Sequence, residues 1–557
     1  MKKTNKLLAI LLAVFMMAVV APMAFAADEV VTIDLANGNV VITETGYSVD
    51  GGAETAFTGD YVFTGKNDET QPGTTIHINS LAEGTDITLK DVEIAQKGPQ
   101  CIVSLVDLTL EATGSVKMSN STPVIVSGAQ KIEIKGDADI SVTSGDQFAY
   151  VPNGTINIAC KNLELTSTGS APIVYRCADF KVNAQEDVVI DGWTSAVINT
   201  DIVAGGDIFA GNEKTTSAVF NGTASLKSTN GDITIDHKGM ICSGNDFVLE
   251  AAGDVTVNAD TSNPAIATGT LTITGDNVTL TNASGMLTSV GTTDIDAKGD
   301  ITIEGNRTGS PVVTGSVAYL NADGNITLTN NASGGGMLST VSIMDVAAKG
   351  DITLTAKISS PMMYTNITAT SENGTVTMTN NGSGFITSGN LVVDAEDIEL
   401  TVVGAGPITP SGYDLTAEND ITISTGYSAT AYSPVEPTAY DFGNKLTVTT
   451  SEGTTEHTHE FADVAYNNDA TCTADGTKLV KCDCQWAKEK TVTAEGTKLD
   501  HVDADGDYLC DNACGYEFEK PADETCPDCG RPAHEDTFIQ NLVCLIVMLI
   551  NLIKTAF

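Results

Sequence analysis

The pentapeptide GDITI at residues 231–235 decides the fold, because close variants of it return along most of the chain. It recurs as GDVTV from Gly253, GDITI from Gly299, GNITL from Gly324 and GDITL from Gly350. The first aliphatic residues of the copies, here called the anchors, are Val116, Ile140, Leu163, Val188, Ile208, Ile233, Val255, Val278, Ile301, Ile326, Ile352, Val376, Ile398 and Ile421. Successive anchors are 20 to 26 residues apart, and a period of this size indicates a stacked repeat architecture.

Each repeat contains three short stretches with the period-2 alternation of a half-buried strand. One repeat reads PAIATG from Pro264, TLTITG from Thr270 and then the motif strand from Asp276. Gly, Asn and Asp separate the stretches, and we expect them to form tight corners with positive φ. One such turn cannot bury its apolar face alone, whereas a stack of turns can. We therefore predict a right-handed parallel β-helix, a β-solenoid with about 23 residues per coil.

Asn282, Asn330 and Asn380 recur just after the anchor strands, in TLTNASG, TLTNNASG and TMTNNGSG. Two interpretations stay open. Stacked amides form ladders in other stacked β structures, and asparagine is also a common turn former.

The first 26 residues have the pattern of an export signal. A basic start with three lysines precedes an apolar stretch over residues 7–20, and Ala24-Phe25-Ala26 forms a small-x-small cleavage site. We expect a bacterial protein that leaves the cytoplasm by the Sec route, with residues 1–26 removed, and that is extracellular or on the cell surface.

The chain carries 72 acidic and 28 basic residues, a formal net charge of −44. Nucleic-acid binding requires clustered Lys and Arg, so this balance argues against a nucleic-acid partner. The charge is explained by solubility in the external medium, and binding of divalent cations by surface carboxylates is the alternative.

Changes in composition predict four further segments. Residues 27–83 are less regular and fit an N-terminal cap with the first coils, because terminal repeats are atypical. Residues 84–450 form the β-helix, whose last coil we expect at Leu446, 25 residues after Ile421. Residues 451–535 are a Cys/His-rich module, and residues 536–557 an apolar C-terminal helix.

Two sets of ligands in the Cys/His-rich module predict zinc sites. Two cysteine pairs separated by eleven residues suit one tetrahedral Zn²⁺, and they are Cys510, Cys514, Cys526 and Cys529. A second set, with a tighter Cys-x-Cys spacing, is Cys472, Cys482, Cys484 and His501. Disulfides are the competing interpretation, because the protein is predicted to be exported.

Alternate carboxylates at Asp503, Asp505 and Asp507 lie in a glycine-containing loop and predict a Ca²⁺ site. The cysteines of the β-helix, by contrast, show no metal-ligand spacing. We expect Cys101, Cys160, Cys177 and Cys242 to be small buried hydrophobic residues.

The last twenty residues, FIQNLVCLIVMLINLIKTAF over 538–557, are apolar at helical spacing. This length barely suffices for a membrane span, and a thin polar stripe includes Gln540, Asn541 and Asn551. Contact with a membrane, at its interface or across it, and docking onto a partner both stay open.

Three resemblances accompany these patterns. Strands such as GDITLTA from Gly350 resemble those of filamentous-haemagglutinin-type adhesins and other secreted right-handed β-helix proteins. The segment YVFTG…TTIHINS…DITLKDVEI over 61–94 is similar to calcium-dependent carbohydrate-binding β-helix domains on surface proteins of anaerobic Firmicutes. The stretches from HTHEF to CPDCGRPAHED, over 457–536, resemble Cys/His repeats and terminal segments of gut Firmicutes surface proteins. The last resemblance implies a location at the cell surface rather than a chemistry.

We therefore expect a non-enzymatic surface or secreted β-solenoid with an adhesion, scaffold or glycan-contact role, whose partners are host or microbial glycans or surface proteins. A calcium-dependent carbohydrate-binding protein is the first alternative, and a polysaccharide lyase or hydrolase is the second. Lyases use a base and an arginine beside a uronate, and hydrolases use clustered carboxylates. Here Arg176 and Arg307 are far apart, and no aspartate pair stands out in the sequence.

Overall fold

The computed structural model contains two compact units that divide between His457 and Thr458. It describes residues 29–519 and 538–556, except for gaps at 68–71, 196, 213–216, 263–264, 284–287, 290, 306–312, 334–337, 358–362, 364–365, 383, 385, 405, 407, 409–411, 427–438, 484–488 and 513. The predicted export signal lies outside the described residues.

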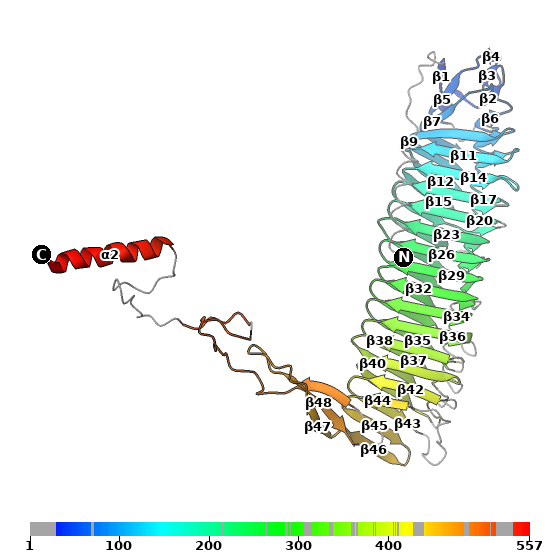
Figure 1. The fold of residues 1–557 in the computed structure, drawn as a ribbon. Helices are drawn as coiled ribbons and strands as arrows, with labels where there is room; N and C mark the ends of the chain where they lie inside the picture. Colours follow the sequence, from blue (N-terminus) through cyan, green and yellow to red (C-terminus); the bar gives the residue numbers. More distant parts are fainter. Residues whose placement is uncertain are drawn as a thin grey trace. The chain divides into compact units, whose positions relative to one another are not determined.

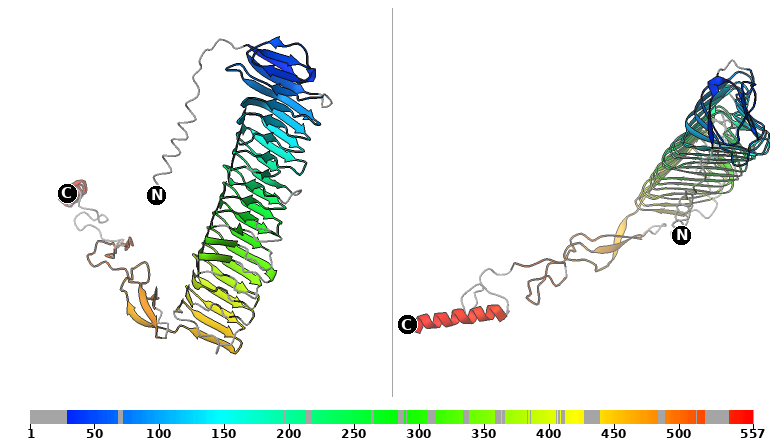
Figure 2. Two further views of the ribbon diagram at one scale, coloured as in Figure 1. Left: turned by 90° about the vertical axis from the view of Figure 1, so that its right-hand side faces the viewer. Right: turned by 90° about the horizontal axis from the view of Figure 1, so that it is seen from above.

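The first unit is a β-solenoid with coils of about 24 residues, as predicted (Figure 1). The coils stack along a single axis, and each contributes strands to parallel faces that we call A, B and C (Figure 2). Face A contains the motif strands β12 (Asp139–Ser144), β15 (Asn162–Ser167), β18 (Val188–Asp191), β21 (Ile208–Asn212), β24 (Ile233–His237), β27 (Val255–Ala259), β30 (Val278–Asn282), β33 (Ile301–Gly305), β35 (Ile326–Ser333), β37 (Ile352–Lys357), β39 (Thr375–Asn380), β41 (Asp397–Val402), β43 (Ile421–Thr425) and β45 (Lys445–Thr450).

The other faces are built in the same way. Face B contains β11 (Lys131–Gly136), β14 (Thr155–Cys160), β17 (Asp179–Ala184), β20 (Asn199–Ala204), β23 (Thr223–Ser228), β26 (Asp246–Ala251), β29 (Thr270–Gly275), β32 (Thr292–Ala297), β38 (Asn366–Ser371), β40 (Asn390–Ala395), β42 (Gly412–Ala417) and β44 (Ala439–Phe442). Face C contains β6 (Ile76–Ile78), β8 (Ile102–Ser104), β10 (Ile125–Ser127), β13 (Ala149–Tyr150), β16 (Val174–Tyr175), β19 (Thr194–Ser195), β22 (Phe220–Asn221), β25 (Cys242–Ser243), β28 (Ile266–Ala267) and β31 (Thr288–Ser289).

Four longer strands turn a corner and belong to two faces. Strands β7 (Ile87–Gln96) and β9 (Leu108–Asn120) run from face B into face A. Strands β34 (Val313–Ala322) and β36 (Leu338–Ala348) run from face C into face B. After β45, the strand β46 (Gly453–Thr458) follows in the chain.

The anchors form one continuous column on face A. Val116 pairs with Ile140, Ile140 with Leu163, and the same register continues through every anchor to Ile421. Ile421 then pairs with Leu446, so the structure contains a coil at the position predicted for Leu446. Each anchor is at most 2% exposed, because it points into the apolar core of the coil while its neighbours in the strand point outward.

The aspartate or asparagine of the repeat forms a second column, which we call the Asx ladder. In each rung the side-chain Oδ1 of one coil accepts a hydrogen bond from a backbone N–H of the next coil, as Asp232 does from Asp254 at 2.8 Å. The rungs measure 2.7–3.0 Å and run without a break from Asn162 through Asp187, Asp207, Asp232, Asp254, Asn277, Asp300 and Asn325 to Asp351, which accepts from Thr375.

The Asx ladder explains why glycine precedes aspartate in the motif. A Cβ built at Gly253 would lie 2.1 Å from Asp232 Oδ1, and one at Gly350 would lie 2.4 Å from Asn325 Oδ1. Neither of these glycines has a positive φ. The expectation that motif glycines serve positive-φ corners is therefore wrong at these positions, where glycine leaves room for the side chain of the preceding coil.

The amide column predicted for Asn282, Asn330 and Asn380 is not continuous. All three are buried in one column of face A, but Gly305 and Ala356 occupy the coils between them. Asn380 instead bonds locally, because its Oδ1 accepts from the N–H of residue 382 and its Nδ2 donates to the carbonyl of residue 384. At Asn380 the turn-forming interpretation holds.

The N-terminal end is less regular, as terminal repeats are. Strands β1 (Val30–Asp34) and β5 (Asp60–Lys66) continue the parallel stack, with the short 3₁₀ helix η1 (Leu35–Asn37) after β1. Strands β2 (Val40–Thr43), β3 (Gly46–Val49) and β4 (Thr55–Ala56) form an antiparallel hairpin array. The rings of Tyr47, Phe57 and Tyr61 pack edge to face beside it, which covers apolar surface at this end.

The second unit contains a small antiparallel sheet and one helix. The sheet consists of β47 (Phe461–Tyr466), β48 (Thr477–Cys482) and β49 (Glu489–Thr493). The predicted terminal helix is present as α2 (Phe538–Ala556), and many of its apolar side chains are exposed. Within the part of the chain that the structure describes, no helix reaches the length and hydropathy of a membrane span.

Candidate metal centre

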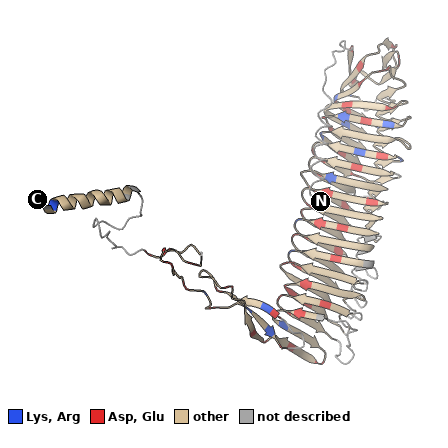
Figure 3. Ribbon diagram, in the orientation of Figure 1, with Lys and Arg blue, Asp and Glu red and all other residues tan. Residues whose placement is uncertain are grey.

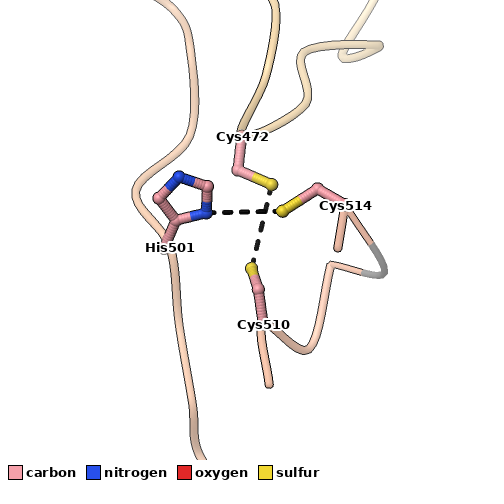
Figure 4. A group of neighbouring side chains, drawn as sticks. All are labelled: Cys472, His501, Cys510 and Cys514. Atoms are coloured by element: carbon pink, nitrogen blue, oxygen red, sulfur yellow. Dashed lines mark hydrogen bonds between the residues drawn. The ribbon is translucent and has the colours of Figure 1, made fainter. Parts of the chain in front are cut away.

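Four side chains from three segments of the second unit meet in one cluster, Cys472, His501, Cys510 and Cys514 (Figure 4). Cys472 lies in the turn between β47 and β48, where the Thr471 hydroxyl accepts from the N–H groups of Thr473 and Ala474. The N–H of Leu499 donates to the Thr471 carbonyl at 2.9 Å, and this bond draws the segment that carries His501 toward the turn.

Cys510 and Cys514 are positioned by a second, hairpin-like turn. The Cys510 N–H donates to the Tyr516 carbonyl at 3.0 Å, and the Phe518 N–H donates to the Tyr508 carbonyl at 2.8 Å. Between these bonds the chain reverses, with φ of +76° at Gly515. Glycine adopts this left-handed conformation without steric cost, so the turn can bring both thiols to the same side.

The four ligand atoms all lie within 4.8 Å of one another. The Sγ atoms of Cys472 and Cys510 are 3.8 Å apart, and Cys514 Sγ is 3.4 Å from His501 Nδ1. A disulfide requires about 2.05 Å between sulfurs, and all the cysteines that the structure describes are free thiols. The arrangement can therefore hold a metal ion.

Aromatic contacts fix the orientation of the histidine ligand. The His501 ring stacks on Tyr516, with ring centroids 3.9 Å apart and an interplanar angle of 11°. Phe518 meets both rings edge on. The histidine that directs Nδ1 toward the thiols is thus held by packing, which limits the conformational entropy that a bound ion would have to remove.

Hydrogen bonds within the cluster shift the thiol pKa values in opposite directions. The pKa of Cys514 is lowered because Cys472 donates a hydrogen bond to it, and the pKa of Cys472 is raised to about 12 by the same interaction. Burial acts to raise the pKa of Cys510, but hydrogen bonds from His501 and from backbone N–H groups outweigh it, so this pKa is also lowered. Two of the three thiols are thus biased toward thiolate, the form that binds metals.

The structure combines residues from the two predicted zinc sets. Cys510 and Cys514 come from one set, and Cys472 and His501 come from the other. Cys482 lies at the end of β48, is buried and is not one of these four. The remaining predicted ligands lie outside the described residues, and they are Cys484, Cys526 and Cys529.

The predicted calcium ligands Asp503, Asp505 and Asp507 also lie together, with carboxylate oxygens within 4.8 Å of one another. Their carboxylates accept hydrogen bonds from backbone N–H groups of the same loop. Asp503 accepts from Gly506 at 2.7 Å and from Tyr508 at 3.1 Å, and Asp507 accepts from Leu509 at 2.8 Å. These bonds fold the loop between His501 and Cys510 and so set the distance between two ligands of the cluster.

The cysteines of the solenoid are buried, as predicted. Cys101, Cys160, Cys177 and Cys242 are each at most 1% exposed. Burial raises the thiol pKa to about 12 at Cys101, Cys160 and Cys242, and to about 11 at Cys177. They behave as small apolar residues of the core.

Comparisons of the chain with protein-family models, with curated proteins and with solved structures found no match.

Proposed function

We propose that this chain is a non-enzymatic β-solenoid, exported to the medium or the cell surface, whose faces contact glycans or surface proteins. Its C-terminal module would then be stabilised by a structural Zn²⁺. The unbroken register of the anchors supports the first part, because it produces long faces with a regular strand spacing. Repeat proteins commonly use such extended surfaces for binding. Asp and Glu along the solenoid keep these faces hydrated in an external medium (Figure 3).

Zinc is favoured by the distances in the cluster. In a tetrahedral site with Zn–S of about 2.3 Å and Zn–N of about 2.05 Å, two sulfurs stand about 3.8 Å apart and a sulfur and a nitrogen about 3.6 Å apart. The observed separations are 3.8 Å and 3.4 Å. Three cysteines and one histidine are a common closed set for structural zinc. In a module with so small a sheet, the bound ion would supply folding free energy that the core lacks.

A calcium-dependent carbohydrate-binding protein remains the second candidate. It is favoured by Asp503, Asp505 and Asp507, because hard carboxylate oxygens are the ligands that Ca²⁺ prefers. This candidate predicts glycan binding that EGTA abolishes and that added Ca²⁺ restores. Binding that persists in EGTA would leave the non-enzymatic solenoid as the better explanation.

The full chain without residues 1–26 tests the proposed function on a glycan and mucin array, together with surface labelling of intact producing cells. Binding to glycans or mucin together with surface or medium localisation supports the proposal. A protein that binds neither glycans nor mucin, or that is retained in the cytoplasm, contradicts the proposal. Release of reducing or unsaturated sugars from pectin, alginate or mucin glycans would establish the lyase or hydrolase alternative instead.

A further inference from the structure

Face A carries a hollow of about 490 Å³ where β15, β18, β21 and β24 lie side by side. An adjoining hollow of about 370 Å³ shares Glu164 and Val189 with it and extends toward β9. The two hollows therefore form one groove that crosses several coils along the solenoid. A groove of this length suits an extended polymer better than a single small molecule.

Gly211 lines the larger hollow at a point where two neighbouring coils approach closely. In the outward column Thr166–Asp191–Gly211–Asp236, each residue pairs with the next coil, and only Gly211 lacks a side chain. A Cβ at this position would lie 1.7 Å from the Asp236 carbonyl oxygen, and φ is +154°, so the chain requires glycine here. Asp191 and Asp236 therefore lie on either side of Gly211 in this column, about 10 Å apart at two strand spacings, and both line the hollow.

One exposed aromatic ring lies in the hollow beside this pair. Phe209 points outward from β21 and is 37% exposed, in a column between Val189 and Thr234. The outward ring of Phe209 and the neighbouring Val189 side chain together offer an apolar platform to a ligand.

Hydrogen bonds orient two of the carboxylates in the hollow. The Asn212 Nδ2 donates to Asp191 Oδ1 at 2.9 Å, and the Ser141 hydroxyl donates to Glu164 Oε2 at 2.8 Å. Each carboxylate keeps a second oxygen that can accept from a ligand. At neutral pH ionised carboxylates only accept hydrogen bonds, so the ligand must supply donors around an apolar surface.

We propose that this groove binds an uncharged polysaccharide, with a sugar ring on Phe209 and its hydroxyls donating to Asp191 and Asp236. A sugar ring presents an apolar C–H face and a rim of hydroxyl donors, which matches one ring between acceptor groups. This inference rests on the proposed glycan-contact function and assigns it a site and a ligand class.

Charge separates this ligand from the alternatives. Uronate or sulfated glycans would bring further negative charge to Glu164, Asp191 and Asp236, which repel it. A polycationic chain would meet one positive charge, Lys117, beside the carboxylates Asp139 and Asp187 in the adjoining hollow, so its binding would be driven by charge and is distinguished by its dependence on salt. Binding of a neutral chain should also depend little on salt, whereas binding of a cationic partner weakens as ionic strength rises.

The experiment uses the full chain without residues 1–26 on an array of neutral, anionic and amino-sugar glycans, followed by titration calorimetry with the best neutral oligosaccharide. Phe209→Ala removes the platform, and Asp236→Asn removes one charge at constant size. The matched control is Tyr319→Ala, since Tyr319 is outward on β34, 38% exposed and outside the groove. Far-UV circular dichroism and the melting midpoint confirm that each variant is folded.

We expect binding to neutral glycans that Phe209→Ala weakens about four- to tenfold, as loss of about half a ring's burial implies. Asp236→Asn should weaken it less, and Tyr319→Ala should not change it. Neutral-glycan binding that Phe209→Ala leaves intact overturns this site but not the proposed function. Binding confined to anionic or amino-sugar glycans overturns the ligand class, and binding to no glycan on the array overturns the glycan-contact function with it.

Discussion

Replacement of Gly253 by alanine tests whether the Asx ladder explains the repeat motif. The new Cβ would lie 2.1 Å from Asp232 Oδ1, well inside van der Waals contact, and Gly253 has no positive φ that alanine would disfavour. The Asp232 carboxylate must therefore rotate away, and it then loses its hydrogen bond from the Asp254 N–H. The backbone itself can stay in place, so the effect should be confined to one rung.

The expected destabilisation is about 2 kcal/mol. A hydrogen bond to a charged acceptor contributes about 1.5–3 kcal/mol, and the displaced side chain adds about 1 kcal/mol of rotamer strain. Alanine offsets about 0.4–1 kcal/mol of this, because it restricts the unfolded chain. In an Asp232→Ala background the clashing carboxylate is already gone and only the Gly231 carbonyl oxygen, 3.1 Å away, remains close, so Gly253→Ala should cost much less and the coupling energy between the two changes should be about 1–2 kcal/mol.

The measurement is urea unfolding followed by far-UV circular dichroism, together with hydrogen exchange of peptides that cover residues 250–260. Exchange is needed because stacked repeats do not always unfold in a single step. Gly98→Ala is the matched control, since no atom lies within 4 Å of its Cβ position and its φ is not positive. Equal effects of Gly253→Ala and Gly98→Ala, or an undiminished effect in the Asp232→Ala background, would refute the explanation.

Three further predictions concern the metal centre and two buried groups. Cys472→Ser should lower bound zinc by one equivalent per chain, as measured by mass spectrometry of the metal, and Cys177→Ser, which changes a solenoid cysteine outside the cluster, should leave the zinc content unchanged. Burial lowers the pKa of His237, whose Nδ1 accepts from a backbone N–H at 3.1 Å. As the pH falls, His237 is protonated at a higher pH in the unfolded chain than in the folded protein. The free energy of unfolding should therefore decrease as the pH drops below about 6.5, and His237→Gln should remove that part of the pH dependence. Cys242, with a pKa that burial raises to about 12, should resist alkylation by iodoacetamide in the folded protein and react in urea; equal rates in both states would show that it is accessible.

The sequence alone was sufficient to predict the stacking of the solenoid, because its signal is local and repeated. Each anchor occupies the same place in its own coil, so the spacing from Val255 to Val278 directly gives the register that the structure contains. The reason for glycine in the motif could not be derived in this way. It depends on Asp232 of the preceding coil, and only the folded stack brings that carboxylate to the Cβ position of Gly253.

The metal centre was predictable in its residue types but not in its grouping. Spacing rules pair cysteines that are near one another in sequence, as in Cys510-x3-Cys514. The other two ligands, Cys472 and His501, come from turns whose approach is fixed by backbone bonds such as Leu499 N–H to the Thr471 carbonyl. The available signal in the sequence was the pair of short turns around Cys472 and before Cys510. Side chains carried by separate turns can point toward one common site.

The Asx ladder also affects how the number of coils can change during evolution. Every rung presents the same acceptor to the coil above and the same donor to the coil below, from Asn162 to Asp351. Duplication or deletion of one whole repeat would therefore leave each remaining partner matched. The solenoid can therefore gain or lose one coil without substitutions in its core. Exchange of whole coils between related chains would also cost little folding free energy.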